Sequence, residues 1–236
     1  MAYHTIGIDV EPADFDRCGK IRADRVFQFF QEAAESQVNA LGVGPDALSG
    51  KGYIWVLTKM RVRYTGEMRA GEKYICTTFP VSRKRATFKR DYYINYASDG
   101  ADPEKAVVIG ASQWCILNRR TRKPEKTDII FDAPEGENDM IEGIFPKIHG
   151  ERPQFVMNHH VNDRDLDYND HCNNTRYIAL SEEATGRNVK EALYVNFANE
   201  TRLGESFDIL MEEQEEGTYV EGRKEDGTTV FQLMFR

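Results

Sequence analysis

The chain has 236 residues, of which 40% are apolar and 30% are charged, and its formal net charge is −8. This composition is typical of a globular protein, long enough for one large domain or two domains of about 100 to 120 residues each. The negative charge argues against a nucleic-acid-binding protein, which needs a basic surface to contact phosphates. No apolar run approaches the roughly 18 residues that a membrane-spanning helix requires.

The N-terminal residues do not have the basic segment and long apolar core of a secretory signal. The four cysteines lie far apart in the sequence, which predicts free thiols instead of a disulfide framework. Both features predict a cytoplasmic protein. No metal or cofactor is predicted either, because the adjacent His159 and His160 have no third ligand at a useful spacing.

The first half of the chain predicts one helix followed by four strands. Apolar residues recur at helical spacing over residues 23–41, and Gly42 suits the helix end. After a glycine-rich segment, alternating patterns predict strands at 54–64, 73–81, 87–96 and 106–118.

The second half predicts the same order of elements. We expect a helix at 175–184 and strands at 192–199, 207–213, 218–223 and 229–235, with hairpin turns at Glu216-Gly217 and Asp226-Gly227. The proline-containing, acidic segment 127–154 is typical of a linker. We therefore divide the chain into a first unit at 1–130, a linker at 131–154 and a second unit at 155–236.

An internal repeat relates the two halves. Residues 62–72 match residues 195–205, and residues 25–34 match residues 176–185. The repeat predicts an α+β protein in which each half is a central helix wrapped by an antiparallel β-sheet. We expect the two halves to pack sheet to sheet, so that one chain replaces a dimer.

Three polar residues occupy alternate positions directly before the second predicted helix: Asp167, Asn169 and His171. In an extended segment their side chains would share one side. The partial positive charge of the helix N-terminus would suit a developing oxyanion. The residues alone leave a second interpretation equally open, a loop that caps the helix, since Asp and Asn are common there.

Three segments carry a resemblance to a known family: residues 53–60, residues 111–122, and Asp165-Leu-Asp-Tyr-Asn-Asp-His171 with its continuation to residue 178. On these segments the chain resembles the acyl carrier protein thioesterases over most of its length. The resemblance implies a tandem, or double, hotdog fold whose second half holds the chemistry.

The Asp-x-Asn-x-His motif of that family falls on Asp167, Asn169 and His171, and its later glutamate falls on Glu200. The next residue here is Thr201, where the family has cysteine, so a cysteine nucleophile is not available at that place. We hypothesise that Glu200 activates the attacking water or attacks directly, and that His171 positions or shuttles protons. Asn169 would donate to the thioester carbonyl or hold the water, and Asp167 would orient Asn169 or the helix entrance.

The first half does not carry the full motif. Asp16 aligns with Asp167, but Cys18 and Lys20 stand where the second half has Asn169 and His171. Only the second half is therefore expected to be catalytic, with the first half as scaffold and acyl pocket. The resemblance implies that the pocket lies between the first helix and its sheet, and ordinary core packing is equally open for each candidate. These candidates are Phe29, Phe30, Ala33, Trp55 and Val56.

Acyl carrier proteins are acidic, so a partner of net negative charge needs a local basic face. Two clusters are candidates for docking, with a solvated surface as the alternative: Arg83, Lys84 and Arg85 in one, and Arg119, Arg120 and Arg122 in the other. The leading hypothesis is a hydrolase that releases free fatty acid from acylated acyl carrier protein. An acyl-CoA thioesterase and a non-catalytic acyl-binding hotdog protein are the alternatives, and a homodimer is possible in each case.

Overall fold

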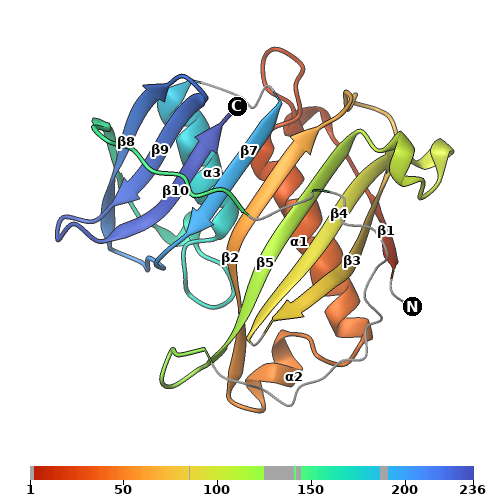
Figure 1. The fold of residues 1–236 in the computed structure, drawn as a ribbon, viewed down its shortest axis with the longest axis horizontal. Helices are drawn as coiled ribbons and strands as arrows, with labels where there is room; N and C mark the ends of the chain where they lie inside the picture. Colours follow the sequence, from red (N-terminus) through yellow and green to blue (C-terminus); the bar gives the residue numbers. More distant parts are fainter. Residues whose placement is uncertain (1–2, 85, 125–140, 142–144, 187–190) are drawn as a thin grey trace.

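The computed structural model describes residues 3–84, 86–124, 141, 145–186 and 191–236. Within them, ten strands form one continuous antiparallel sheet in the order β1-β3-β4-β5-β2-β7-β10-β9-β8-β6 (Figure 1). Most of the predicted linker, residues 131–154, lies outside the described residues. No helix among the described residues has both the length and the apolar character needed to cross a membrane.

The first half contains five strands and two helices. In chain order these are β1 His4–Ile8, α1 Ala23–Ala40, α2 Pro45–Ser49, β2 Tyr53–Tyr64, β3 Tyr74–Lys84, β4 Thr87–Tyr96 and β5 Val108–Asn118. The second half contains five strands and one helix, namely β6 Gln154–His160, α3 Asn174–Thr185, β7 Ala192–Phe197, β8 Ser206–Gln214, β9 Gly217–Arg223 and β10 Thr229–Phe235.

Both predicted helices and all eight predicted strands are confirmed, with ends that differ by three residues or fewer. Three elements were not predicted: α2, β1 and β6. The two strands are the outermost members of the sheet, each paired on one side only. β1 has only five residues and β6 has no buried residue, so neither has the apolar run that marks a strand in sequence.

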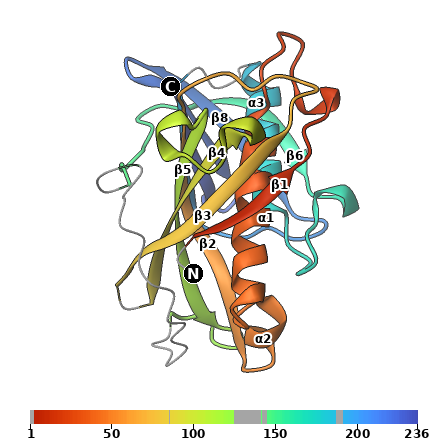
Figure 2. The ribbon, with the colours of Figure 1, turned by 90° about the vertical axis from the view of Figure 1, so that its right-hand side faces the viewer.

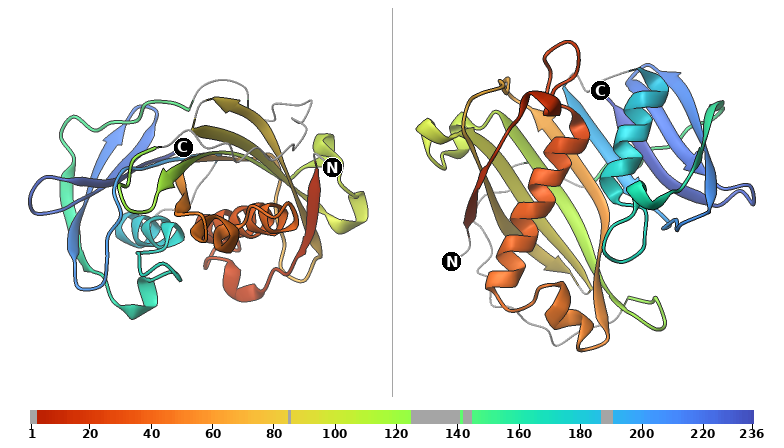
Figure 3. Two further views of the ribbon diagram at one scale, coloured as in Figure 1. Left: turned by 90° about the horizontal axis from the view of Figure 1, so that it is seen from below. Right: turned by 180° about the vertical axis from the view of Figure 1, so that it is seen from behind.

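The two halves join edge to edge through β2 and β7, where Met60 pairs with Val195 and Val62 pairs with Leu193. The prediction that they pack sheet to sheet is wrong. Because β2 and β7 supply backbone donors and acceptors to each other, neither is an exposed edge. Figure 3 shows α1 and α3 side by side on the same face of the curved sheet.

Figure 2 shows α1 lying along the first-half sheet, and the buried residues of the helix are mostly apolar. Phe30 is fully buried and stacks on Tyr92 of β4, with ring centroids 4.6 Å apart. A Cβ atom at Gly110 of β5 would lie 2.3 Å from the Phe30 ring. Glycine is therefore required at this place for the helix to approach the strand, and burying Phe30 contributes about 1.5–3 kcal/mol.

A glutamate of the second half caps the first helix. Arg22, at the N-cap of α1, provides no side-chain cap, and Glu182 Oε1 of α3 accepts a hydrogen bond of 3.2 Å from the Ala23 N–H. Burial, together with the nearby charge of Asp24, raises the pKa of Glu182 to about 8. The contact links the two helices at a place where a buried negative charge is unfavourable.

We expect Glu182→Gln to stabilise the protein increasingly as the pH rises. The native state keeps the Glu182 proton up to about pH 8, whereas an unfolded glutamate loses it near pH 4.3. The contribution of the Glu182 carboxyl to the stability of the folded protein is therefore complete below the pKa of the unfolded state. This contribution falls with rising pH and is lost once the pH has passed the pKa of the folded state. Glutamine keeps the acceptor without the charge.

The measurement is the thermal unfolding midpoint from pH 4 to pH 9. The gain of Glu182→Gln over wild type should grow over this range and level off above about pH 8. The matched control is the adjacent and exposed Glu183→Gln. A gain that does not change with pH would contradict the assignment.

Candidate active site

A buried aspartate anchors the loop that precedes α3. Asp165 ends the short 3₁₀ helix Asp163–Asp165 and is 1% exposed. It accepts hydrogen bonds of 2.9 Å from the Asn162 N–H, from His159 Nε2 and from Arg176 Nε. Burial alone would raise the pKa of Asp165, but these donors outweigh burial and hold the pKa below its ordinary value. The loop is thus tied to both β6 and α3.

The next residues form a tight turn. Asp167 Oδ1 accepts from the backbone N–H groups of Asn169 at 2.8 Å and His171 at 3.2 Å, and Asp170 has a φ of 61°. The expectation of an extended segment with three side chains on one side is therefore wrong. The physical reason is the aspartate itself, because its short side chain satisfies local backbone donors and favours a turn over a strand.

The first half contains the same turn. Asp16 Oδ1 accepts 2.8 Å hydrogen bonds from the N–H groups of Cys18 and Lys20. This turn forms with Cys18 and Lys20 in place of Asn169 and His171. Its aspartate therefore stabilises the turn without taking part in catalysis. By the same geometry, Asp167 shapes the backbone that carries Asn169 and His171.

Substitution of Asp167 separates this positioning role from direct chemistry. Asparagine keeps an oxygen acceptor for the two N–H groups, so we expect Asp167→Asn to retain kcat within about threefold. Asp167→Ala loses this acceptor, which contributes about 1 kcal/mol to the stability of the turn, and misplaces His171. The measurement is kcat for hydrolysis of a thioester, the substrate class expected from the sequence. A loss in Asp167→Asn as large as that in Asp167→Ala would indicate that the charge takes part in the reaction.

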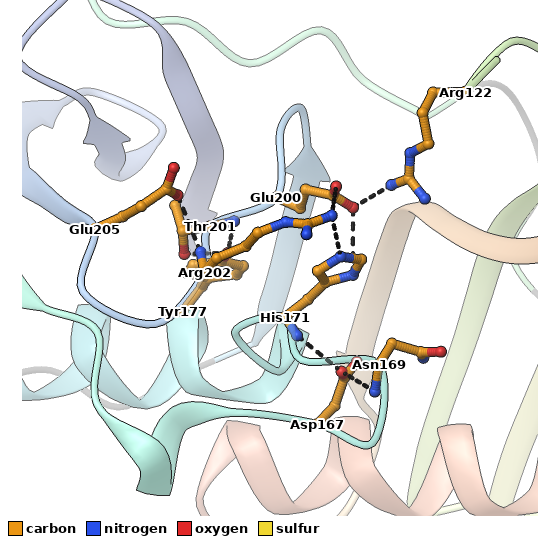
Figure 4. A network of polar contacts seen from close by, with 9 residues as sticks. All are labelled: Arg122, Asp167, Asn169, His171, Tyr177, Glu200, Thr201, Arg202 and Glu205. Atoms are coloured by element: carbon orange, nitrogen blue, oxygen red, sulfur yellow. Dashed lines mark hydrogen bonds and ion pairs between the residues drawn. The ribbon is translucent and has the colours of Figure 1, made fainter. Parts of the chain in front are cut away.

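His171 and Glu200 lie in contact, with 3.3 Å between His171 Nδ1 and Glu200 Oε2 (Figure 4). Arg202 Nη2 lies 3.0 Å from His171 Nε2. A guanidinium group can only donate, so Nε2 is the acceptor. In a neutral imidazole the proton is then on Nδ1, the nitrogen that lies 3.3 Å from Glu200 Oε2.

Two arginines complete the surroundings of Glu200. Arg202 Nη2 lies 3.3 Å from Glu200 Oε1, and Arg122 Nη2 contacts Oε2. Arg122 follows β5 of the first half, where its φ is 56° and its N–H donates to the Asn118 carbonyl. The first half therefore contributes a cation to the site. Arg122 was predicted for carrier docking, and sequence reasoning missed Arg202, which occupies the same place in the repeat as Arg69.

The side chain of Asn169 is not part of this cluster. The residue is exposed, and Figure 4 shows its amide pointing away from the imidazole of His171. The structure thus brings together the predicted His171 and Glu200, and holds Asn169 on the adjacent turn.

Two potential nucleophiles near the site are buried. Thr201 is fully buried, its N–H donates to Tyr177 Oη at 3.2 Å, and its Oγ1 lies 2.9 Å from the same atom. Burial raises the pKa of Cys172 to about 11. Because a thiol attacks as the thiolate, Cys172 is a poor nucleophile near neutral pH. Among these groups the arrangement favours attack by water or by Glu200.

The acyl-pocket candidates lie in two apolar clusters. The main core under α1 contains Phe29, Phe30 and Ala33. Trp55 belongs to a second cluster, where its ring meets the ring of Phe88 at 5.0 Å. Val56 is half-buried on β2. These positions agree equally with core packing and with the wall of a pocket.

The two basic clusters differ in their surroundings. Arg83 places its guanidinium 5.2 Å from the centre of the Phe88 ring. Arg85 and the side chain of Lys84 lie outside the described residues. Arg119 donates to Ser49 Oγ at 2.8 Å. Arg119 and Arg120 also line a surface hollow of about 460 Å³, whose other lining residues are Lys51, Gly52, Tyr53 and Asn118.

The sequence pattern did not indicate Lys51, because the residues of the hollow meet only in the folded chain. In the part of the chain that the structure describes, no group of three or more His, Cys, Asp or Glu side chains is arranged to hold a metal ion.

Two helices, each wrapped by half of an antiparallel sheet, with a polar cluster at the entrance to the second helix, define a double-hotdog protein. The chain belongs to the acyl-ACP thioesterase family. It matches the acyl-ACP thioesterase N-terminal domain over residues 3–130 and the C-terminal domain over residues 148–230.

Curated relatives include the acyl-[acyl-carrier-protein] hydrolase FATB2 of Cuphea viscosissima, which is 26% identical over 199 residues, covering 74% of this chain and 47% of the relative. The palmitoyl-acyl carrier protein thioesterase of Cuphea hookeriana is 25% identical over 199 residues, covering 74% of this chain and 46% of the relative. Both are chloroplastic proteins. The chain thus spans about half the length of the curated relatives it matches.

Two solved structures have the same fold along the whole chain. An acyl-ACP thioesterase from Bacteroides thetaiotaomicron has a TM-score of 0.87 and 21% identity, covering 100% of this chain and 98% of its own. The 12:0-ACP thioesterase from Umbellularia californica has a TM-score of 0.84 and 15% identity, covering 100% and 97%. These similarities confirm the predicted double-hotdog fold.

Proposed function

We propose that this protein hydrolyses the thioester of an acylated acyl carrier protein and releases a free fatty acid. The observation that carries the proposal is the contact between His171 and Glu200 beside two guanidinium groups, in a chain of the acyl-ACP thioesterase family. A carboxylate in contact with an imidazole can act as a general base toward water.

In the proposed reaction, Glu200 accepts a proton from water as the water oxygen bonds to the thioester carbonyl carbon. Collapse of the tetrahedral intermediate breaks the carbon–sulfur bond, and the leaving thiolate takes up the proton held by Glu200 and His171. Guanidinium N–H groups would donate to the oxyanion, and the amide of Asn169 would join them only after its side chain turns toward His171.

The test is hydrolysis of purified acyl carrier protein thioesters of graded chain length, with matching coenzyme A esters and His171→Ala as control. Release of fatty acid from the carrier protein esters that collapses in the variant supports the proposal. Equal or better release from the coenzyme A esters would transfer the assignment to an acyl-CoA thioesterase. No release, together with tight acyl binding, would favour a non-catalytic acyl-binding protein.

We further propose that Arg119, Arg120 and Lys51 receive the acidic carrier protein. The proposal is supported by the surface hollow that they line and by the position of Arg122, only two residues after Arg120, at Glu200. A carrier bound at this hollow would hold its thioester close to the acid-base pair. Complementary charge of this kind raises the association rate and is weakened by salt.

Reversing the charge of Arg119 and Arg120 to glutamate is expected to raise KM for the carrier protein thioester by about tenfold at low salt, since steering by rim charges acts on association. The KM for a coenzyme A ester should change much less. Arg17→Glu, at an exposed position on the first-half turn, is the matched control. An unchanged KM for the carrier protein thioester would contradict the proposal that the carrier protein docks at this hollow.

A further inference from the structure

Arg90 is a cation in the interior of the first half. It lies on β4, faces α1 and is only 5% exposed. Among the described residues it forms no ion pair with a carboxylate. Its described hydrogen bonds go from Nη1 to Gln37 Oε1 of α1 and, at 3.1 Å, to Thr78 Oγ1 of β3. A buried charge without a counter-ion is strongly unfavourable, so its presence calls for a physical reason.

The unpaired side of this guanidinium has a specific shape. Both described bonds use Nη1, and neither Nε nor Nη2 donates to any described residue. Nε and Nη2 form the side of the fork that binds a carboxylate through two parallel hydrogen bonds. Burial lowers the pKa of the neighbouring His4, and the Arg90 charge lowers it further.

The neighbours of Arg90 on its face of β4 are aromatic. Phe88 and Tyr92, two positions before and after Arg90 on β4, share its face of the sheet. Phe30 stacks on Tyr92 and Trp55 contacts Phe88. Apolar side chains on both sides of a cation suit a carboxylate attached to a hydrocarbon better than a small hydrated anion.

We propose that Arg90 anchors a carboxylate-binding site between α1 and the first-half sheet, and that the ligand is an alkyl carboxylate. The carboxylate is either the head group of a free fatty acid or the far end of a dicarboxylic acyl chain. The alkyl part of the inference rests on the proposed function, whereas the carboxylate part rests on the guanidinium alone.

The binding test is isothermal titration calorimetry with decanoic acid and 1-decanol at pH 8. Wild type is expected to bind the acid at least about tenfold more tightly than the alcohol, because charge-assisted bidentate hydrogen bonds are among the strongest in proteins. Arg90→Met should lose this preference. Lys89→Met, which removes the adjacent cation from the other face of β4, should keep it.

Arg90→Met removes a buried charge and is expected to fold, and its thermal unfolding is measured alongside. Arg90→Lys is the second variant, because it keeps the charge without the planar fork and should also lose most of the preference. Equal binding of acid and alcohol by wild type, or an undiminished preference in Arg90→Met, would overturn the inference.

Hydrolysis distinguishes the two sources of the carboxylate. If the far end of the chain binds, wild type shows a lower KM for the thioester of decanedioic acid than for that of decanoic acid, and Arg90→Met abolishes the difference. If the head group of a fatty acid binds, free decanoate inhibits wild type about tenfold more strongly than Arg90→Met. Failure of wild type to hydrolyse any thioester would refute the proposed function, and the calorimetry would still decide the role of Arg90.

Discussion

Replacing Glu200 with glutamine is expected to lower kcat for thioester hydrolysis by about 10²- to 10⁴-fold, the usual loss when a general base is removed. Glutamine has nearly the same shape and keeps an oxygen that can accept from Arg122 and Arg202. It cannot take a proton from water. The loss should therefore appear in kcat with a well-folded protein, measured as free fatty acid released from an acyl carrier protein thioester.

The internal repeat supplies the control. Glu67 occupies the same place in the first half as Glu200 and is exposed, so Glu67→Gln should retain full activity. His171→Ala should lose activity over the same range as Glu200→Gln, because the imidazole orients the carboxylate and participates in proton transfer. If both Glu200→Gln and His171→Ala keep activity within tenfold of wild type, the assignment of this pair is wrong.

Asp165→Ala is expected to lower the free energy of unfolding by about 3–5 kcal/mol, the usual range for removing one partner of a buried ion pair. The substitution leaves the donors of His159, Arg176 and Asn162 without their common acceptor. Urea denaturation measures the loss. Activity should fall as well, since the loop that carries His171 loses its attachment to β6 and α3.

Asp14→Ala is the matched variant in the first half. Asp14 Oδ1 pairs with Arg25 Nε at 2.7 Å, and Asp14 Oδ2 accepts from the Glu11 N–H at 2.9 Å. Asp14 has no described histidine partner, so we expect a smaller loss of stability and no direct effect on the site. A larger loss from Asp14→Ala than from Asp165→Ala would contradict the role given to the histidine and to α3.

The effect of Asp165 also depends on pH in a defined direction. Its folded pKa lies below the value of an unfolded aspartate, which is about 3.9. The stabilisation is therefore complete above about pH 4 and is lost as the pH falls through the folded pKa. The difference between wild type and Asp165→Ala should be constant from pH 5 to pH 7 and should narrow below pH 4. A difference that does not narrow at all as the pH falls below 4 would be inconsistent with this linkage.

Much of the fold follows from patterns that act locally. The apolar spacing of α1 survives in the sequence because one side of the helix is buried along its length. The eight described strands that are paired on both sides are the eight that the sequence predicted. The way the halves join could not be predicted, because the pairing of β2 with β7 depends on two strand edges that are far apart in the chain.

The site was predictable only in part. The motif and the later glutamate indicated His171 and Glu200, and the structure brings them into contact. The turn at Asp167 was not predicted, because one residue with positive φ, Asp170, is enough to break the alternation expected of an extended segment. The two arginines at Glu200 could not be identified from spacing, since Arg122 arrives from the other half of the chain.

The covalent joining of two similar units through β2 and β7 has a consequence for how the protein can change. In a homodimer, any substitution alters both copies at once, and the two sites stay identical. Here a substitution alters one unit only, so Lys20 can stand in one turn while His171 stands in the other. A fused chain can therefore have the contact between His171 and Glu200 in one unit and a buried guanidinium in the other, whereas a symmetric homodimer cannot.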